Sequence, residues 1–202
     1  MAVMTVLFRG KAGRRLVHLV GGCIPALLGL LLPRKPLLLF LGSVAALFVV
    51  GESLRLLVPA VNRWLMSFVS PAAGSFKDRE AARPIGTTFF VLGSFLSFLI
   101  FPRDVAVAAL FYSAVGDAAA ATVGERFGHI RIGNKSLEGS AGFLASSLAV
   151  GVILVVAGLP LGWLTVAVGA LVAALVELLP SPLVDDNLTI PLASGAAMAL
   201  LR

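Results

Sequence analysis

The middle of the chain carries the side chains best suited to chemistry. Asp117 and Glu125 are eight residues apart, so on a helix they lie near one face. A loop with Gly128 and Gly133 follows, and Lys135 comes directly after it. Backbone N–H groups at a helix N-terminus and a lysine ammonium favour a polyphosphate, and nearby carboxylates hold Mg²⁺ through one or two oxygens. The segment therefore predicts a site for a polyphosphate with magnesium.

The loop resembles a P-loop in spacing without matching it. Its pattern, Gly128-x-x-x-x-Gly133-Asn134-Lys135-Ser136, is one residue longer than the P-loop motif. A P-loop also follows a β-strand, whereas this loop follows an apolar segment with helical character. We therefore expect similar loop chemistry on a different fold.

Small residues recur every four positions along the segment that carries Asp117. They are Gly116, Ala120 and Gly124. Such a stripe lets two helices pack closely. We expect it to face a neighbouring helix.

Few other ionisable residues lie within or beside apolar segments, and each is a candidate for function because a charge in lipid is costly. Glu52 ends the second apolar segment, and Glu177 lies near the end of the sixth. Asp185 and Asp186 directly precede the seventh. We interpret Glu177 as an interfacial residue and the others as functional candidates.

The composition requires a membrane around these residues. Of the 202 residues, 59% are hydrophobic and 13% are charged, and the mean hydropathy is +1.03. A soluble domain has about 25% charged residues, and a globule of this size could not bury so much apolar surface. The net charge of +6 does not indicate nucleic-acid binding, because Lys and Arg at loop ends set the orientation of membrane proteins.

The apolar segments predict an all-α fold, a polytopic membrane helix bundle of about seven transmembrane helices. A single integral membrane domain, residues 1–202, is expected, because seven spans of about 20 residues leave no room for a soluble domain. The second span is expected to continue as an amphipathic helix through Val69. The spans are Leu16–Leu32, Pro36–Gly51, Pro84–Phe101, Val105–Val123, Gly139–Leu159, Leu161–Leu179 and Leu188–Leu201.

Basic residues orient the predicted bundle. With the N-terminus inside, the inner segments hold three times as many Lys and Arg residues as the outer ones. The cytoplasmic parts are then a basic N-terminal segment, residues 1–15, and loops that include residues 70–83 and 124–138. The functional candidates gather at this cytoplasmic face.

Several separated motifs resemble those of the CTP-dependent lipid-alcohol kinases, a family that comprises dolichol kinase, phytol kinase and the CTP-dependent diacylglycerol kinase. Arg15 stands where lysine is more usual in the family, which changes the geometry of its donors. The resemblance runs from about Arg14 to the C-terminus. The motifs are Gly116-Asp117, Gly124, Phe127-Gly128, Lys135-Ser136-x-Glu138-Gly139-Ser140 and Asp185-Asp186-Asn187-Leu188-Thr189-Ile190-Pro191, with Arg14-Arg15-x-x-His18 and Glu52-x-x-Arg55 before them.

The resemblance implies transfer of the γ-phosphoryl group of CTP, with Mg²⁺, to the hydroxyl of a membrane lipid alcohol such as phytol, a polyprenol, dolichol or diacylglycerol. The implied catalytic residues are Asp117, Lys135, Asp185 and Asp186, and the implied metal ligands are Asp117, Glu138 and Asp186. Glu138 could instead order the loop. The implied contacts to substrate and nucleotide are Arg14, Arg15, His18, Glu52, Arg55, Gly124, Arg126, Arg131, Ser136, Glu138, Gly139 and Asn187.

Two other functions stay open on the sequence. Phosphatidate cytidylyltransferases share the Gly-Asp and Lys-x-x-Glu-Gly motifs but end with a different aspartate signature, so Asp185-Asp186-Asn187 favours a kinase. A small transporter could use Asp117 and Glu177 as a proton relay. Transporters usually carry internal repeats and place ionisable residues near the membrane midplane, and the chain shows neither.

Overall fold

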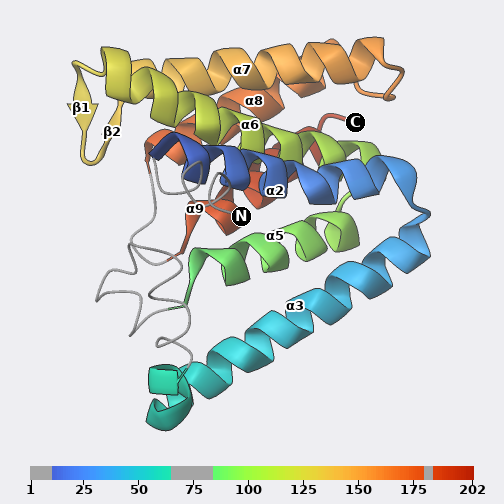
Figure 1. The fold of residues 1–202 in the computed structure, drawn as a ribbon. Coiled ribbons are helices and arrows are strands. Elements are labelled where there is room, and N and C mark those ends of the chain that lie inside the picture. The colour runs from blue at the N-terminus through green and yellow to red at the C-terminus, as the bar shows by residue number, and fades with distance from the viewer. Residues whose placement is uncertain (1–10, 65–83, 180–183) are drawn as a thin grey trace.

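The computed structural model describes residues 11–64, 84–179 and 184–202, and within α2 it describes the side chains of Leu16 and of residues 19–31. The described chain is a helix bundle, which confirms the all-α class (Figure 1). Each predicted span overlaps one helix. The helices are α2 (Lys11–Leu31), α3 (Arg34–Leu57), α5 (Gly86–Ile100), α6 (Arg103–Phe127), α7 (Leu137–Val156), α8 (Trp163–Leu178) and α9 (Asp186–Ala199).

Three of the described helices, α3, α6 and α7, are long and apolar enough to cross a membrane. Residues Leu19–Leu31 of α2, together with α5 and α8, form shorter apolar helices. These lengths support a membrane protein. The number of seven spans and the inside position of the N-terminus stay predictions.

The predicted continuation of the second span through Val69 is wrong in one respect. Helix α3 ends at Leu57, and Val58 has extended backbone angles. The reason is Pro59, because a proline disfavours helical angles in the residue before it. Residues 59–64 form a separate helical segment, and residues 65–69 lie outside the described residues.

Helix α6 lies at the centre of the bundle, between α7 and α2 in Figure 1. Its buried side chains are mostly alanine and valine, which let neighbours approach on several sides. The predicted stripe of small residues faces α7. A Cβ atom on Gly116 would come within 2.5 Å of the Phe143 ring, and one on Gly139 would come within 2.9 Å of the Ala120 carbonyl oxygen.

A β-hairpin interrupts the loop predicted at residues 124–138. Helix α6 runs on to Phe127, and β1 (Arg131–Ile132) then pairs antiparallel with β2 (Lys135–Ser136). Gly133 starts the two-residue turn with a φ of +60°, a conformation that glycine adopts without steric cost. The hairpin delivers Lys135 to the start of α7.

The two ends of the bundle differ. At the end away from the hairpin, Arg34 donates to the carbonyl oxygens of Phe98 and Leu99 at 3.3 Å. Arg103 donates to carbonyls at the end of α2, and the Arg202 Nε atom lies 3.2 Å from Asp104 Oδ2. Basic side chains there stabilise the carbonyl ends of helices. Lys135 and Glu138 lie at the opposite end, in the hairpin and in the first turn of α7.

Candidate active site

A pocket of about 340 Å³ opens at the hairpin end of the bundle. Its wall comes from the last turns of α6, the hairpin, the start of α7 and the end of α8. The structure thus brings Asp117 and Lys135 to the same pocket. The lining residues are Asp117, Ala120, Ala121, Gly124, Glu125, Arg131, Asn134, Lys135, Ser136, Gly139 and Glu177.

Lys135 lies between two carboxylates. Its Nζ atom is 2.8 Å from Glu177 Oε1 and 3.1 Å from Asp186 Oδ2. Burial lowers the pKa of Lys135, but the charges and hydrogen bonds of Glu177 and Asp186 outweigh burial and raise it. The ammonium is therefore a stable positive charge in the pocket wall.

Glu177 is the residue whose role the sequence interpretation missed. The residue is only 2% exposed, and its Oε2 accepts a hydrogen bond from Ser140 Oγ at 2.6 Å. A buried carboxylate needs such partners, since an unpaired buried charge is costly. The sequence feature that could have indicated this role is that Glu177 is the only acid in an otherwise apolar helix. Such a residue is a functional candidate by default.

The structure separates the two neighbouring aspartates. Asp185 is the N-cap of α9, and its Oδ1 accepts hydrogen bonds from the backbone N (3.0 Å) and side-chain Nδ2 (2.6 Å) of Asn187. Asp186 instead reaches Lys135. Asn187 therefore makes a capping contact rather than a contact with the pocket.

Asp186 lies in an environment that disfavours its charge. Burial raises its pKa, Lys135 opposes that rise, and the negative charges of Asp185 and Asp117 add to it. Asp117 is thus close enough to Asp186 to interact electrostatically. Two carboxylates from α6 and α9 share the neighbourhood of one ammonium.

The carboxylates offer the type of ligand that magnesium takes when a substrate completes its shell. Within the residues that the structure describes, no cluster of three or more His, Cys, Asp or Glu side chains could hold a metal by itself. Magnesium commonly takes only one or two carboxylates and completes its shell with phosphates and water. Asp117 and Asp186 supply oxygens of that kind.

Glu138, predicted as a metal ligand or a loop-ordering residue, makes loop contacts and does not line the pocket. Its carboxylate accepts hydrogen bonds from the backbone N atoms of His129 and Ile130, each at 3.1 Å. A hydrogen bond from its own backbone N–H and those from Ile130 and His129 outweigh desolvation and lower its pKa. The contacts tie the start of the hairpin loop to the first turn of α7.

Ser136, Gly124 and Gly139 form a tight joint between α6 and α7. Ser136 caps α7, because its Oγ accepts a hydrogen bond from the Gly139 backbone N at 3.1 Å. A Cβ atom on either glycine would come within 2.9 Å of that Oγ. The joint places the N–H end of α7 beside the pocket, where the helix dipole favours an anion.

The predicted basic contacts fall into three groups. Arg131 is exposed and lines the pocket, whereas Arg126 is exposed outside the set of lining residues. The side chains of Arg14, Arg15 and His18 lie outside the described ones, so their roles stay predictions.

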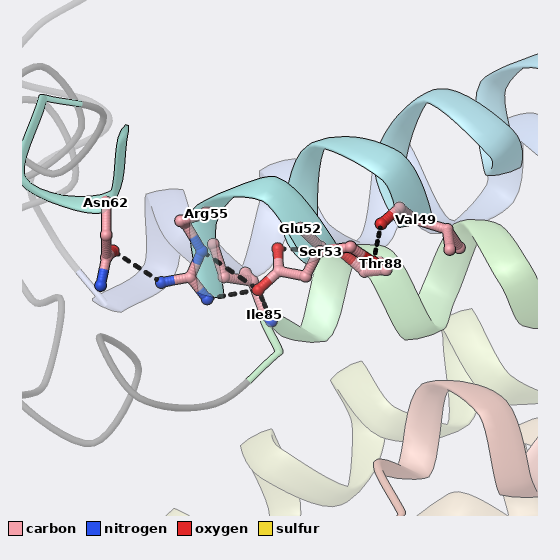
Figure 2. Close-up of polar contacts among 7 residues, drawn as sticks. All are labelled: Val49, Glu52, Ser53, Arg55, Asn62, Ile85 and Thr88. Carbon is pink, nitrogen blue, oxygen red and sulfur yellow. Dashed lines mark hydrogen bonds and ion pairs between the residues drawn. The ribbon is translucent and has the colours of Figure 1, made fainter. Parts of the chain in front are cut away.

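Glu52 and Arg55 form a second polar cluster, outside the pocket lining (Figure 2). Arg55 is 1% exposed, pairs with Glu52, and donates to Asn62 Oδ1 at 3.1 Å. Glu52 also accepts hydrogen bonds from the Ile85 backbone N at 3.2 Å and from Thr88 Oγ1 at 3.3 Å. The cluster fastens the end of α3 to the start of α5, and a contact of this pair with substrate stays a prediction.

The start of α5 in turn packs on the start of α9. A Cβ atom on Gly86 would lie 3.4 Å from Asn187 Nδ2 and 3.5 Å from Asp185 Oδ2, and one on Gly93 would lie 2.6 Å from the Asn187 carbonyl oxygen. Helix α9 can approach α5 this closely because both positions lack a side chain. The second cluster is therefore connected to the turn that carries Asp186.

Comparison with known proteins relates this site to lipid kinases. The chain is 34% identical to a probable chloroplastic phytol kinase 1 of Glycine max over 163 residues, which cover 69% of this chain and 54% of that protein. It is 32% identical to the CTP-dependent diacylglycerol kinase 1 of Saccharomyces cerevisiae over 105 residues, or 50% of this chain and 34% of that protein. It is also 24% identical to an uncharacterised protein of Rickettsia prowazekii over 181 residues, or 89% of this chain and 88% of that protein.

The matched regions span about half of the soybean protein and about a third of the yeast protein. No family model and no solved structure matches the chain. The similarity to proteins with these names supports a relationship with the CTP-dependent lipid kinases.

Proposed function

We propose that the protein is an integral membrane kinase that transfers the γ-phosphoryl group of CTP to the hydroxyl of a membrane lipid alcohol at the cytoplasmic face. The observation that carries this proposal is the ammonium of Lys135 between Glu177 and Asp186, on the wall of a pocket that also contains Asp117. Relatives named phytol kinase and CTP-dependent diacylglycerol kinase supply the class of donor and acceptor.

The pocket supplies the charges that phosphoryl transfer needs. The reaction depends on positioning and on neutralising phosphate charge. Lys135 and Arg131 offer cationic donors to the triphosphate, and the N–H end of α7 adds its dipole. Asp117 and Asp186 are the residues that would hold Mg²⁺. The bound ion would offset the negative charge that the transferring phosphoryl oxygens develop.

The acceptor hydroxyl has one well-placed carboxylate. Asp185 caps α9 through Oδ1, whereas Asp186 pairs with Lys135, which lines the pocket. Of the two aspartates, Asp186 is therefore the better candidate for either role, to hold Mg²⁺ with Asp117 or to orient the alcohol and accept its proton as the new O–P bond forms and CDP leaves. The apolar tail of the alcohol would stay in the bilayer. Phytol, a polyprenol, dolichol and diacylglycerol all meet this requirement.

Label transfer from CTP tests this proposal. Purified protein in detergent with Mg²⁺ is given γ-labelled or α-labelled CTP and a panel of lipid alcohols, and the extracted lipid is counted. Label from the γ position alone supports the kinase, and the best acceptor identifies the alcohol. Parallel reactions with EDTA test the dependence on magnesium.

Two other results would replace the proposal. Label from the α position onto a phosphorylated lipid acceptor would show cytidylyltransferase chemistry. No transfer to any lipid would favour the transporter interpretation, which a flux assay in proteoliposomes would then examine.

A further inference from the structure

The two carboxylates that pair with Lys135 differ in their exposure to solvent. The Glu177 side chain is 3% exposed, whereas the Asp186 side chain is 26% exposed. Glu177 also has a second partner, because its other oxygen accepts a hydrogen bond from Ser140 at 2.6 Å. The Glu177 carboxylate is therefore almost completely buried at the pocket wall, whereas the Asp186 carboxylate is partly exposed to water.

Separating Lys135 from each carboxylate has a different consequence. If the ammonium left Glu177, a buried negative charge would lose its cation, which is strongly unfavourable. If it left Asp186, water could solvate that carboxylate. The contact with Asp186 is thus the easier one to exchange.

The pocket brings an incoming anion to this ammonium. Lys135 lines the pocket together with Arg131 and Asn134, next to the capped N-terminus of α7. An ammonium has three N–H donors, so it can keep one carboxylate partner while it turns another donor to a phosphate oxygen. This arrangement allows exchange without movement of the backbone.

We infer that Glu177 is a positioning residue that anchors Lys135. Asp186 is the exchangeable partner: when the triphosphate binds, it replaces Asp186 as a partner of the Lys135 ammonium. The inference rests on the proposed function, because it names CTP as the incoming anion. The exchange also releases Asp186 at the moment when metal and alcohol arrive. Glu177 also lines the pocket, but in this inference it acts through Lys135.

Equilibrium binding of CTP to the full chain in detergent, with EDTA present to remove metal, tests the exchange. Asp186→Asn removes the competitor for Lys135, so CTP should bind about threefold to tenfold more tightly. Glu177→Gln removes the anchor, so CTP should bind about tenfold more weakly, the size of one charge-assisted hydrogen bond. Ser140→Ala removes the hydrogen bond to Glu177 without changing any charge. It should also weaken CTP binding, but by less than Glu177→Gln does.

The opposite changes in CTP affinity distinguish this inference from a simple charge effect. Both Asp186→Asn and Glu177→Gln remove one negative charge, so mere repulsion of the triphosphate predicts tighter binding in both. That result, or an unchanged affinity in both, would overturn the inference. Asp104→Asn, an equivalent change at the other end of the bundle, is the matched control and should leave CTP affinity unchanged.

Two further measurements complete the test. If Glu177→Gln does not fold, Ser140→Ala and Asp186→Asn still give the two opposite signs. If wild type transfers γ-label but the variants change CTP affinity in the same direction, the exchange is refuted and the kinase proposal remains intact. Wild-type protein that neither binds CTP nor transfers label would refute both.

Discussion

Two acid–base clusters lie toward the hairpin end of the bundle, and they differ in what they can do. At the pocket, one ammonium, that of Lys135, faces two carboxylates, and part of the cluster is exposed. At the end of α3, Arg55 and Glu52 form a closely matched pair that is almost completely buried. The first cluster has a charge partner to exchange with a ligand. The second, among the residues that the structure describes, pairs one guanidinium with one carboxylate and holds two helices together.

The difference follows from the geometry of the cations. Lysine is a compact charge on a flexible stem, whereas the guanidinium of arginine is a rigid fork that matches carboxylates. Arg55 uses this fork on Glu52 and Asn62 at once. Variants in the pocket should therefore change catalysis and CTP binding, and variants in the buried pair should change stability.

The largest expected effect lies in the pocket. Asp117→Asn removes a carboxylate that we assign to Mg²⁺, and γ-label transfer should fall by about 10³ or more. Membrane expression and elution in size-exclusion chromatography should match wild type, because the amide has the same shape. Activity close to that of wild type would remove Asp117 from the site.

Arg55→Lys should show the reverse pattern. A lysine cannot reproduce the fork between Glu52 and Asn62, so the folded state should lose about 2–3 kcal/mol. Thermal unfolding in detergent measures the loss, and CTP affinity of the folded variant should equal that of wild type. Weaker CTP binding with unchanged stability would instead make Arg55 a substrate contact and end the distinction between the clusters.

Thr88→Val makes a smaller change in the same buried cluster. It removes the hydroxyl that donates to Glu52 Oε2 and nearly preserves the volume. We expect a loss of about 0.5–1.5 kcal/mol in thermal unfolding. A clear change in CTP affinity without this loss would contradict a purely structural role for the contact.

The smallest effect concerns Glu138, and it depends on pH. The folded state lowers the pKa of Glu138 below its ordinary value of 4.5, so its contribution to stability is present above that pH and is lost as pH falls through the folded pKa. Wild type should therefore unfold at a slightly higher temperature than Glu138→Gln at pH 7. The gap should close below pH 4.5. A gap of constant size across this range would show that the charge of Glu138 does not contribute.

Much of the fold was predictable because apolar length and bounding residues carry the signal for membrane helices. Each of the seven predicted runs overlaps a described helix. The break at Val58 was also readable, since Pro59 follows it. The hairpin was less so, because strands of two residues have too few positions to show an alternating pattern.

The pocket was only partly predictable. Asp117 and Lys135 are connected by a short segment and could be expected together. The contact between Lys135 and Asp186 spans 51 residues, and the contact between Ser140 and Glu177 spans 37, so no local pattern connects them. The interpretation of Glu177 as interfacial therefore did not predict its contacts with Lys135 and Ser140.

The sequence by itself determined an apolar helix bundle with its acids and bases gathered beside the loop before α7, because composition and spacing set helix length and position along the chain. Only the tertiary structure decided that Glu177 and Asp186 both pair with Lys135 and that Arg55 is buried. The physical reason is rotation and packing. The direction in which a side chain leaves its helix, toward lipid, a neighbour or a pocket, depends on the helices that contact it.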